Sequence, residues 1–121
     1  MKIKSVNIRE KFQGFSDYWS PKVVGELNGQ HVKIAKFKGE FVMHHHEHED
    51  EFFHVIAGEL YIELKDKTLH LSQGDFVIIP KGIEHKPYAP EEACVMLFEP
   101  ASTVNTGNVK NHQTISDLDK I

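Results

Sequence analysis

Apolar side chains recur at every second position in a series of short runs, which is the pattern of β-strands with one buried face. The expected strands are 22–27, 31–38, 52–57, 60–64, 68–71, 76–79 and 93–98. Asn28-Gly29 between the first two strands is a hairpin signal, because both residues tolerate positive φ. Turn signals every eight to twelve residues or so predict an antiparallel sandwich or barrel, with an immunoglobulin-like sandwich as the alternative fold.

The expected strands divide the chain into an N-terminal segment (1–21), a barrel (22–100) and a polar tail (101–121). The N-terminal segment is rich in aromatic residues, and we expect it to cover the barrel or a partner subunit, with one helical turn over 9–11. The run 76–79 is apolar at every position and is expected to be buried on both faces. A short helix capped by Ser116 is expected at the end of the tail.

Length, charge and cysteine content restrict the class of protein. A chain of 121 residues is enough for one domain with a hydrophobic core. The net charge of −4 gives no reason to expect nucleic acid or an anionic membrane as a partner. No apolar stretch is long enough to span a bilayer, and the N-terminus has no apolar signal-peptide region. Cys94 is the only cysteine, so no internal disulfide forms and a cytoplasmic location is expected.

The stretch 39–58 gathers histidines and carboxylates between two expected strands. Strand alternation places His44, His46 and His48 on one face and His45 on the other. Two histidines two residues apart can present their ring nitrogens to one point, which is the geometry that a metal ion requires. Glu51 can join that face only if the chain turns or bulges across 47–50, where four polar or charged residues favour a turn.

Other interpretations of the histidine stretch remain open. Histidine runs are often purification tags, but this run is internal and interrupted by Glu47. The stretch could also be a solvated loop, or His46 and His48 could be the metal-binding pair instead. His85 adds a third candidate, because it follows a rigid Pro-x-Gly turn at 80–82 that fixes the direction of its side chain. A lone histidine in that position is more often structural than a ligand.

Two stretches of the chain resemble the paired motifs of the cupin superfamily. The first is similar to the pattern Gly…His-x-His-x4-Glu-x6-Gly, here with His44, His46, Glu51 and Gly58. The second is similar to Gly-x5-Pro-x-Gly-x2-His, here with Gly74, Pro80, Gly82 and His85. The spacing from Gly39 to His44 is one residue shorter than usual, and Ala89 stands where the second motif usually has Asn. Within the superfamily, the chain most resembles small single-domain proteins described as mannose-6-phosphate-isomerase-like.

The resemblance implies an all-β fold, an antiparallel double-stranded β-helix (the jelly-roll or cupin barrel) in a single domain. It also implies one divalent transition metal inside the barrel, bound by His44, His46, Glu51 and His85. These ligands accept Fe, Mn, Ni, Co or Zn, so affinity alone does not choose the metal. Small cupins commonly pair, and the apolar N-terminal segment exceeds what a small barrel can hide, so we expect a homodimer.

Other polar and apolar residues have weaker assignments. Phe53, Val55, Leu60, Ile62 and Met96 could line the pocket, although most are expected to serve as barrel core. His48 has the parity to approach the metal, whereas His54 is expected to face outward or toward a partner subunit. Glu84 could be solvated or act as an acid or base, and Tyr88 could donate a hydrogen bond at the mouth of the barrel.

Three functions are compatible with these features. The first is a metal-dependent enzyme, an oxygenase or isomerase, acting on a small oxygenated or sugar-like metabolite. The second is a module that binds or senses a small ligand without turnover, and the third is a structural metal domain. Four protein ligands leave one or two coordination positions open, which favours the enzyme, because structural zinc sites are normally closed. Arg9 is the only arginine, which disfavours a sugar phosphate as the substrate.

Overall fold

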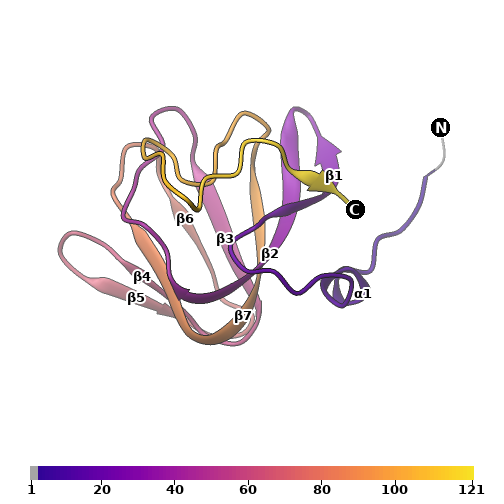
Figure 1. Ribbon diagram of the computed structural model, residues 1–121, viewed down its shortest axis with the longest axis horizontal. Helices are drawn as coiled ribbons and strands as arrows, with labels where there is room; N and C mark the ends of the chain where they lie inside the picture. The colour runs from indigo at the N-terminus through magenta and orange to yellow at the C-terminus, as the bar shows by residue number, and fades with distance from the viewer. Residues whose placement is uncertain (1–2) are drawn as a thin grey trace.

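The computed structural model describes residues 3–121, and most of its regular structure is β-strand (Figure 1). The elements in chain order are α1 (Ile8–Phe12), β1 (Lys22–Leu27), β2 (Gln30–Glu40), β3 (Glu51–Ala57), β4 (Leu60–Glu63), β5 (Thr68–Leu71), β6 (Phe76–Ile79), β7 (Lys86–Pro100) and β8 (Asp119–Lys120). The predicted all-β fold is confirmed, and every expected strand is present, but β7 begins at Lys86 and is much longer than the expected strand 93–98. No helix within residues 3–121 is long and apolar enough to cross a membrane.

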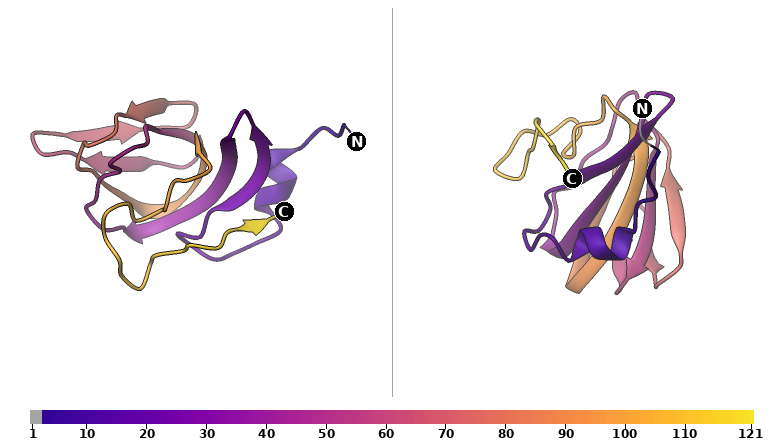
Figure 2. Two further views of the ribbon diagram at one scale, coloured as in Figure 1. Left: turned by 90° about the horizontal axis from the view of Figure 1, so that it is seen from above. Right: turned by 90° about the vertical axis from the view of Figure 1, so that its right-hand side faces the viewer.

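Strand β7 joins the two halves of the sheet into a barrel (Figures 1 and 2). Its first half pairs with β4, as in Ile62 opposite Pro87, and its second half pairs with β3, as in Val55 opposite Val95. Strand β2 runs antiparallel to nearly the whole of β7 on its other side. Because one long curved strand belongs to both halves, the inward side chains of β2 to β7 share one interior.

The interior is built from alternate positions of the strands, as a period of two requires. Ala35 on β2, Val55 on β3 and Val95 on β7 are all fully buried and lie in register with one another. Phe53 on β3 packs inside opposite Leu97 on β7. The side chains of the metal-site candidates belong to the same inward-facing set, so the core and the candidate site are continuous.

The N-terminal segment packs across β2. Helix α1 is capped by Asn7, whose Oδ1 accepts the backbone N–H of Glu10 at 3.0 Å, and Phe12 is buried. Trp19 lies farther along and stacks on Phe37, with ring centroids 4.2 Å apart. These aromatic side chains are therefore covered within the chain itself, and the homodimer remains a prediction.

Two expectations about the ends of the barrel are wrong. Strand β6 is not buried on both faces, because it pairs with β3 alone and leaves Phe76 and Ile78 60% and 55% exposed. The tail forms no helix after Ser116 and ends in β8, which pairs parallel with β1. Asn105 holds the tail instead, since its amide accepts from the backbone of Ile115 and donates to that of Gln113. Such side-chain bonds compete with helix formation.

Candidate metal centre

The two histidine-bearing segments are joined through their backbones. His44 donates its backbone N–H to the carbonyl oxygen of His85 at 3.0 Å, and His85 returns the bond to His44 at 2.8 Å. Next to this pair, Gly82 donates its N–H to the carbonyl oxygen of His46 at 2.8 Å. Gly82 has φ of +82°, a conformation that glycine adopts without strain, which explains the Pro-x-Gly turn before His85.

Four candidate ligands converge inside the barrel. Nitrogen and oxygen atoms of His44, His46, Glu51 and His85 all lie within 4.8 Å of one another. Each of these residues is at most 3% exposed. The structure therefore brings together all four residues that the motifs indicated, and it draws them from the loop before β3, the start of β3 and the loop before β7.

Backbone carbonyls orient two of the imidazoles. Nδ1 of His44 lies 2.8 Å from the carbonyl oxygen of Val42, and Nδ1 of His85 lies 2.9 Å from that of Ile83. A carbonyl oxygen only accepts, so each Nδ1 must carry the proton and each Nε2 must present a lone pair. This is the arrangement by which proteins prepare histidine for a metal ion.

The remaining polar atoms also fit a cation. Nε2 of His46 and Nε2 of His85 each lie 3.2 Å from Oε1 of Glu51. Nε2 of His44 is buried and has no hydrogen-bond partner among the described residues. Leaving such a nitrogen unpaired in a protein interior costs free energy, and a metal ion would satisfy it. Three imidazoles and one carboxylate are a donor set that divalent transition metals accept.

Burial and neighbouring charges shift the acidities in this cluster. Burial, reinforced by the proximity of His85, lowers the pKa of His44 to about 4, which keeps this ring neutral and able to bind a metal. Burial would raise the pKa of Glu51, but the close contacts with the His46 and His85 imidazoles outweigh it and hold that pKa well below its usual range. Both shifts favour the protonation states that a metal site needs.

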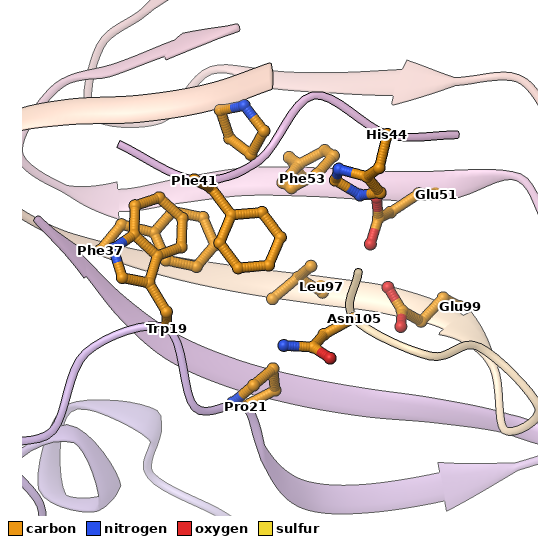
Figure 3. A pocket seen from close by; sticks show the side chains of 11 residues that line it. Trp19, Pro21, Phe37, Phe41, His44, Glu51, Phe53, Leu97, Glu99 and Asn105 are labelled. Atoms are coloured by element: carbon orange, nitrogen blue, oxygen red, sulfur yellow. The ribbon is translucent and has the colours of Figure 1, made fainter. Parts of the chain in front are cut away.

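A narrow cavity of about 30 Å³ is lined by two of the four candidate ligands, His44 and Glu51 (Figure 3). Trp19, Phe37 and Phe41 stack at one end of it. Near the other end, the carboxyl groups of Glu51 and Glu99 point toward one another. Burial and the charge of Glu51 raise the pKa of the Glu99 carboxyl well above its usual range, against the opposing effect of the Lys33 ammonium. A divalent cation held by Glu51 would lower it again.

Several residues singled out by sequence lie away from this cluster. His48 is exposed, because the chain bends at 47–48 and the strand alternation that would have aligned it stops there. His45 faces outward as predicted, with its ring nitrogens near carboxylate oxygens of Glu47 and Glu84. Glu84 is thus on the outside, and Tyr88 stacks on Tyr61 with ring centroids 5.2 Å apart.

The expected pocket lining is correct only in part. Phe53 lines the cavity, and Val55, Leu60 and Ile62 are fully buried in the core. Met96 is instead half-buried opposite His54, on the other side of β7 from Val95 and Leu97. Sequence reasoning missed Trp19, Leu97, Glu99 and Asn105 as lining residues. The alternation along 93–98 could have revealed Leu97 and, one step further, Glu99.

Comparison with known protein families shows which family has this fold and these motifs. Residues 30–99, more than half of the chain, match the model of the cupin domain. The chain belongs to the cupin family. A cupin-2 domain-containing protein from Shewanella frigidimarina has a solved structure that is 44% identical, with a TM-score of 0.78 over 78% of this chain and 93% of that one. This agreement confirms the resemblance that the two motifs indicated.

Other cupin relatives are more distant or have no assigned activity. An uncharacterised protein of Bacillus subtilis, YdbB, is 41% identical over 80 residues, which are 65% of either chain. The 3-hydroxyanthranilate 3,4-dioxygenase of Xenopus laevis is 24% identical over 102 residues, and the match covers 78% of this chain but 36% of the dioxygenase. A structure from Neisseria meningitidis, 19% identical with a TM-score of 0.74 over 81% of this chain and all of that one, shares the fold.

Proposed function

We propose that this cupin is a metal-dependent enzyme, of the oxygenase or isomerase type, that acts on a small oxygenated metabolite. The observation that carries the proposal is the convergence of His44, His46, Glu51 and His85 at one point beside a cavity. A purely structural metal site is normally closed by its ligands and needs no cavity next to it. Four protein ligands leave room in the coordination sphere for a substrate atom.

The residues of the chain prepare the site before any ligand arrives. The carbonyl oxygens of Val42 and Ile83 fix the orientation of two imidazoles, so little reorganisation is needed when the site is filled. Apolar walls, including Phe53 and Leu97, keep bulk water away from the reacting end of a substrate. A divalent metal bound there supplies Lewis acidity, and a redox-active metal also supplies dioxygen chemistry.

The cavity favours some substrates over others. Among residues 3–121, no lysine or arginine lines the cavity. Phosphate recognition usually recruits arginine, lysine or a helix N-terminus, so the cavity gives no support to a sugar phosphate as substrate. The similarity to a 3-hydroxyanthranilate 3,4-dioxygenase supports the oxygenase over the isomerase, although the match covers a minor part of that protein.

The second candidate is a cupin module that binds a small ligand without turnover. The cavity of about 30 Å³ is too narrow for a whole metabolite without movement of the walls, so it favours a very small ligand for either candidate. The two candidates differ in one measurable property, the consumption of oxygen or substrate by metal-loaded protein.

The test is a comparison of metal content and turnover in three proteins. Wild type, His46→Ala and His45→Ala are loaded separately with Fe(II), Mn(II), Co(II), Ni(II) and Zn(II). Each is then incubated with small hydroxy acids, enols and sugars while oxygen uptake and product formation are followed. Turnover by wild type and His45→Ala, but not by His46→Ala, supports the enzyme. Binding of metal and ligand by wild type and His45→Ala without turnover favours the binding module, and failure of the wild type to bind any metal overturns the enzyme and leaves the binding module.

A further inference from the structure

Glu99 is a buried carboxylate with one oxygen in use and one free. It lies near the end of β7, and its Oε2 accepts a hydrogen bond from Nζ of Lys33 on β2 at 2.7 Å. Both side chains are nearly inaccessible, 2% exposed for Glu99 and 3% for Lys33. Oε1 of Glu99 is buried and has no hydrogen-bond partner among residues 3–121. Glu99 also lines the cavity beside the metal ligands.

This free oxygen has a defined chemical role. The ammonium of Lys33 can only donate, so it fixes one carboxylate oxygen and leaves the other to accept from a different partner. A buried acceptor without a donor costs free energy, so a group that brings an N–H or O–H to Oε1 binds favourably. The carboxyl groups of Glu99 and Glu51 point toward one another, so this acceptor is a close neighbour of a metal ligand (Figure 3).

We propose that Glu99 is a ligand-contacting residue, which accepts a hydrogen bond from a hydroxyl or amine on the carbon adjacent to the one that bears the metal-binding oxygen of the substrate. The inference rests on the metal site of the proposed function and names its substrate class. Hydroxy acids, enediols and vicinal diols all carry such a donor. Molecules that bind metal through the same oxygens but lack the neighbouring donor are poor ligands.

The size and lining of the cavity agree with this class. A volume of about 30 Å³ holds the centres of roughly two or three water-sized groups. That is enough for the donor group and its carbon, with the metal-binding oxygen in the coordination sphere. The rest of the lining near Glu99 includes Leu97 and Phe53, which offer no competing acceptor. Apart from the metal-ligand candidates His44 and Glu51, the other polar lining residue is Asn105, whose amide is held by the backbone of the tail.

The test compares glycolate with methoxyacetate on Co(II)-loaded protein, followed by visible absorption of the metal. Both ligands offer the metal a carboxylate and a second oxygen, but only glycolate carries an O–H donor. Wild type should bind glycolate at least about tenfold more tightly, the size expected for a hydrogen bond to a charged group. Glu99→Gln should reduce this preference to about twofold or less. Its amide oxygen must accept from Lys33, so its NH2 group, a donor, faces the cavity.

Metal content is measured in every sample, which separates this inference from the proposed function. Glu63→Gln, an exposed carboxylate on β4, is the matched control and should keep the wild-type preference. If wild type holds Co(II) but shows no preference for glycolate, Oε1 meets water only and the inference is overturned. A preference that persists in Glu99→Gln reflects chelation and also overturns it. If Glu99→Gln does not fold, the ratio of the glycolate and methoxyacetate affinities is measured in Glu99→Asp instead. The shorter side chain moves the acceptor away from the ligand, so the same reduction in preference is expected.

Discussion

The backbones of His44 and His85 are paired by two reciprocal hydrogen bonds, at 3.0 and 2.8 Å, although the residues are far apart in the sequence. Their imidazole centroids lie 4.3 Å apart as a result. The loop that carries His44 and the turn that precedes His85 are therefore one structural unit. Displacing either segment moves two ligands at once, which makes the geometry of the site sensitive to changes well outside the four ligands.

Replacing His46 or His85 by alanine should lower metal occupancy from about one ion per chain to a small fraction. Each change removes one of four donors that lie within 4.8 Å of one another. His45→Ala should retain the wild-type occupancy, because its ring contacts Glu47 and Glu84 on the outside. Elemental analysis after purification without chelator measures the number of metal ions per chain. Loss of metal in His45→Ala with retention in His46→Ala would mean that the ligand assignment is wrong.

Removing the metal with a chelator should lower the melting temperature of the wild type. A ligand that binds only the folded state stabilises it by about 2.7 kcal/mol at a free concentration one hundred times its dissociation constant. His46→Ala should melt at nearly the same temperature with and without added metal. Differential scanning calorimetry with stepwise addition of Co(II) measures both. Equal metal-induced shifts in the two proteins would contradict a role for His46 as a ligand.

In metal-free protein, acid should weaken the fold through His44. Its pKa is about 4 in the folded state and near 6.5 in the unfolded chain, so the unfolded state takes up the proton first. The contribution of His44 to the free energy of unfolding is constant above about pH 6.5. It is lost progressively as the pH falls toward 4, by at most about 3 kcal/mol. Urea unfolding of wild type and His44→Gln between pH 7 and 4 isolates this effect. The difference between the two free energies of unfolding should change with pH, whereas a constant difference would contradict burial of a neutral His44.

Gly107→Ala should destabilise the protein more than Gly29→Ala. A Cβ on Gly107 would overlap the carbonyl oxygen of His45 and come within 3.0 Å of Cδ2 of His44. Gly29 has the same left-handed backbone but has no atom within 4 Å of that position. The first change should therefore cost about 2 kcal/mol or more, and the second about 1 kcal/mol from backbone strain alone. Thermal unfolding measures both losses of stability. Similar losses would show that the tail does not pack against the loop that carries His44 and His45.

A homodimer that involves the N-terminal segment remains a prediction. Ile3 and Val6 are 94% and 47% exposed, so part of the apolar surface of this segment is not covered within the chain. Sedimentation velocity at micromolar concentration should give twice the monomer mass of 13.9 kDa. Ile3→Ser with Val6→Ser should shift the protein toward monomer, whereas Leu27→Ser, at an equally exposed apolar position elsewhere, should not. A monomeric wild type contradicts the prediction.

The fold and the identity of the four clustered residues could be predicted from sequence because they depend on local patterns. A period of two defines the strands, and Asn28-Gly29 places a hairpin turn where both residues have positive φ. The family motifs are equally local, since each ligand lies at a fixed distance from a turn. Where a strand ends, however, alternation ceases to apply. His48 therefore leaves the face of His44 and His46, although its parity matches theirs.

The surroundings of the site were decided by tertiary structure alone. Trp19 precedes the barrel and Asn105 follows it, yet both reach one cavity because the two ends of the chain fold back over the strands. The alternation along β7 is consistent with an inward-facing Glu99, but only the register of β2 against β7 gives it Lys33 as a buried partner. Strand β6 is uniformly apolar, but its position at a sheet edge exposes Phe76. Sequence fixes which way neighbouring side chains alternate, whereas pairing between distant segments fixes what each side chain meets.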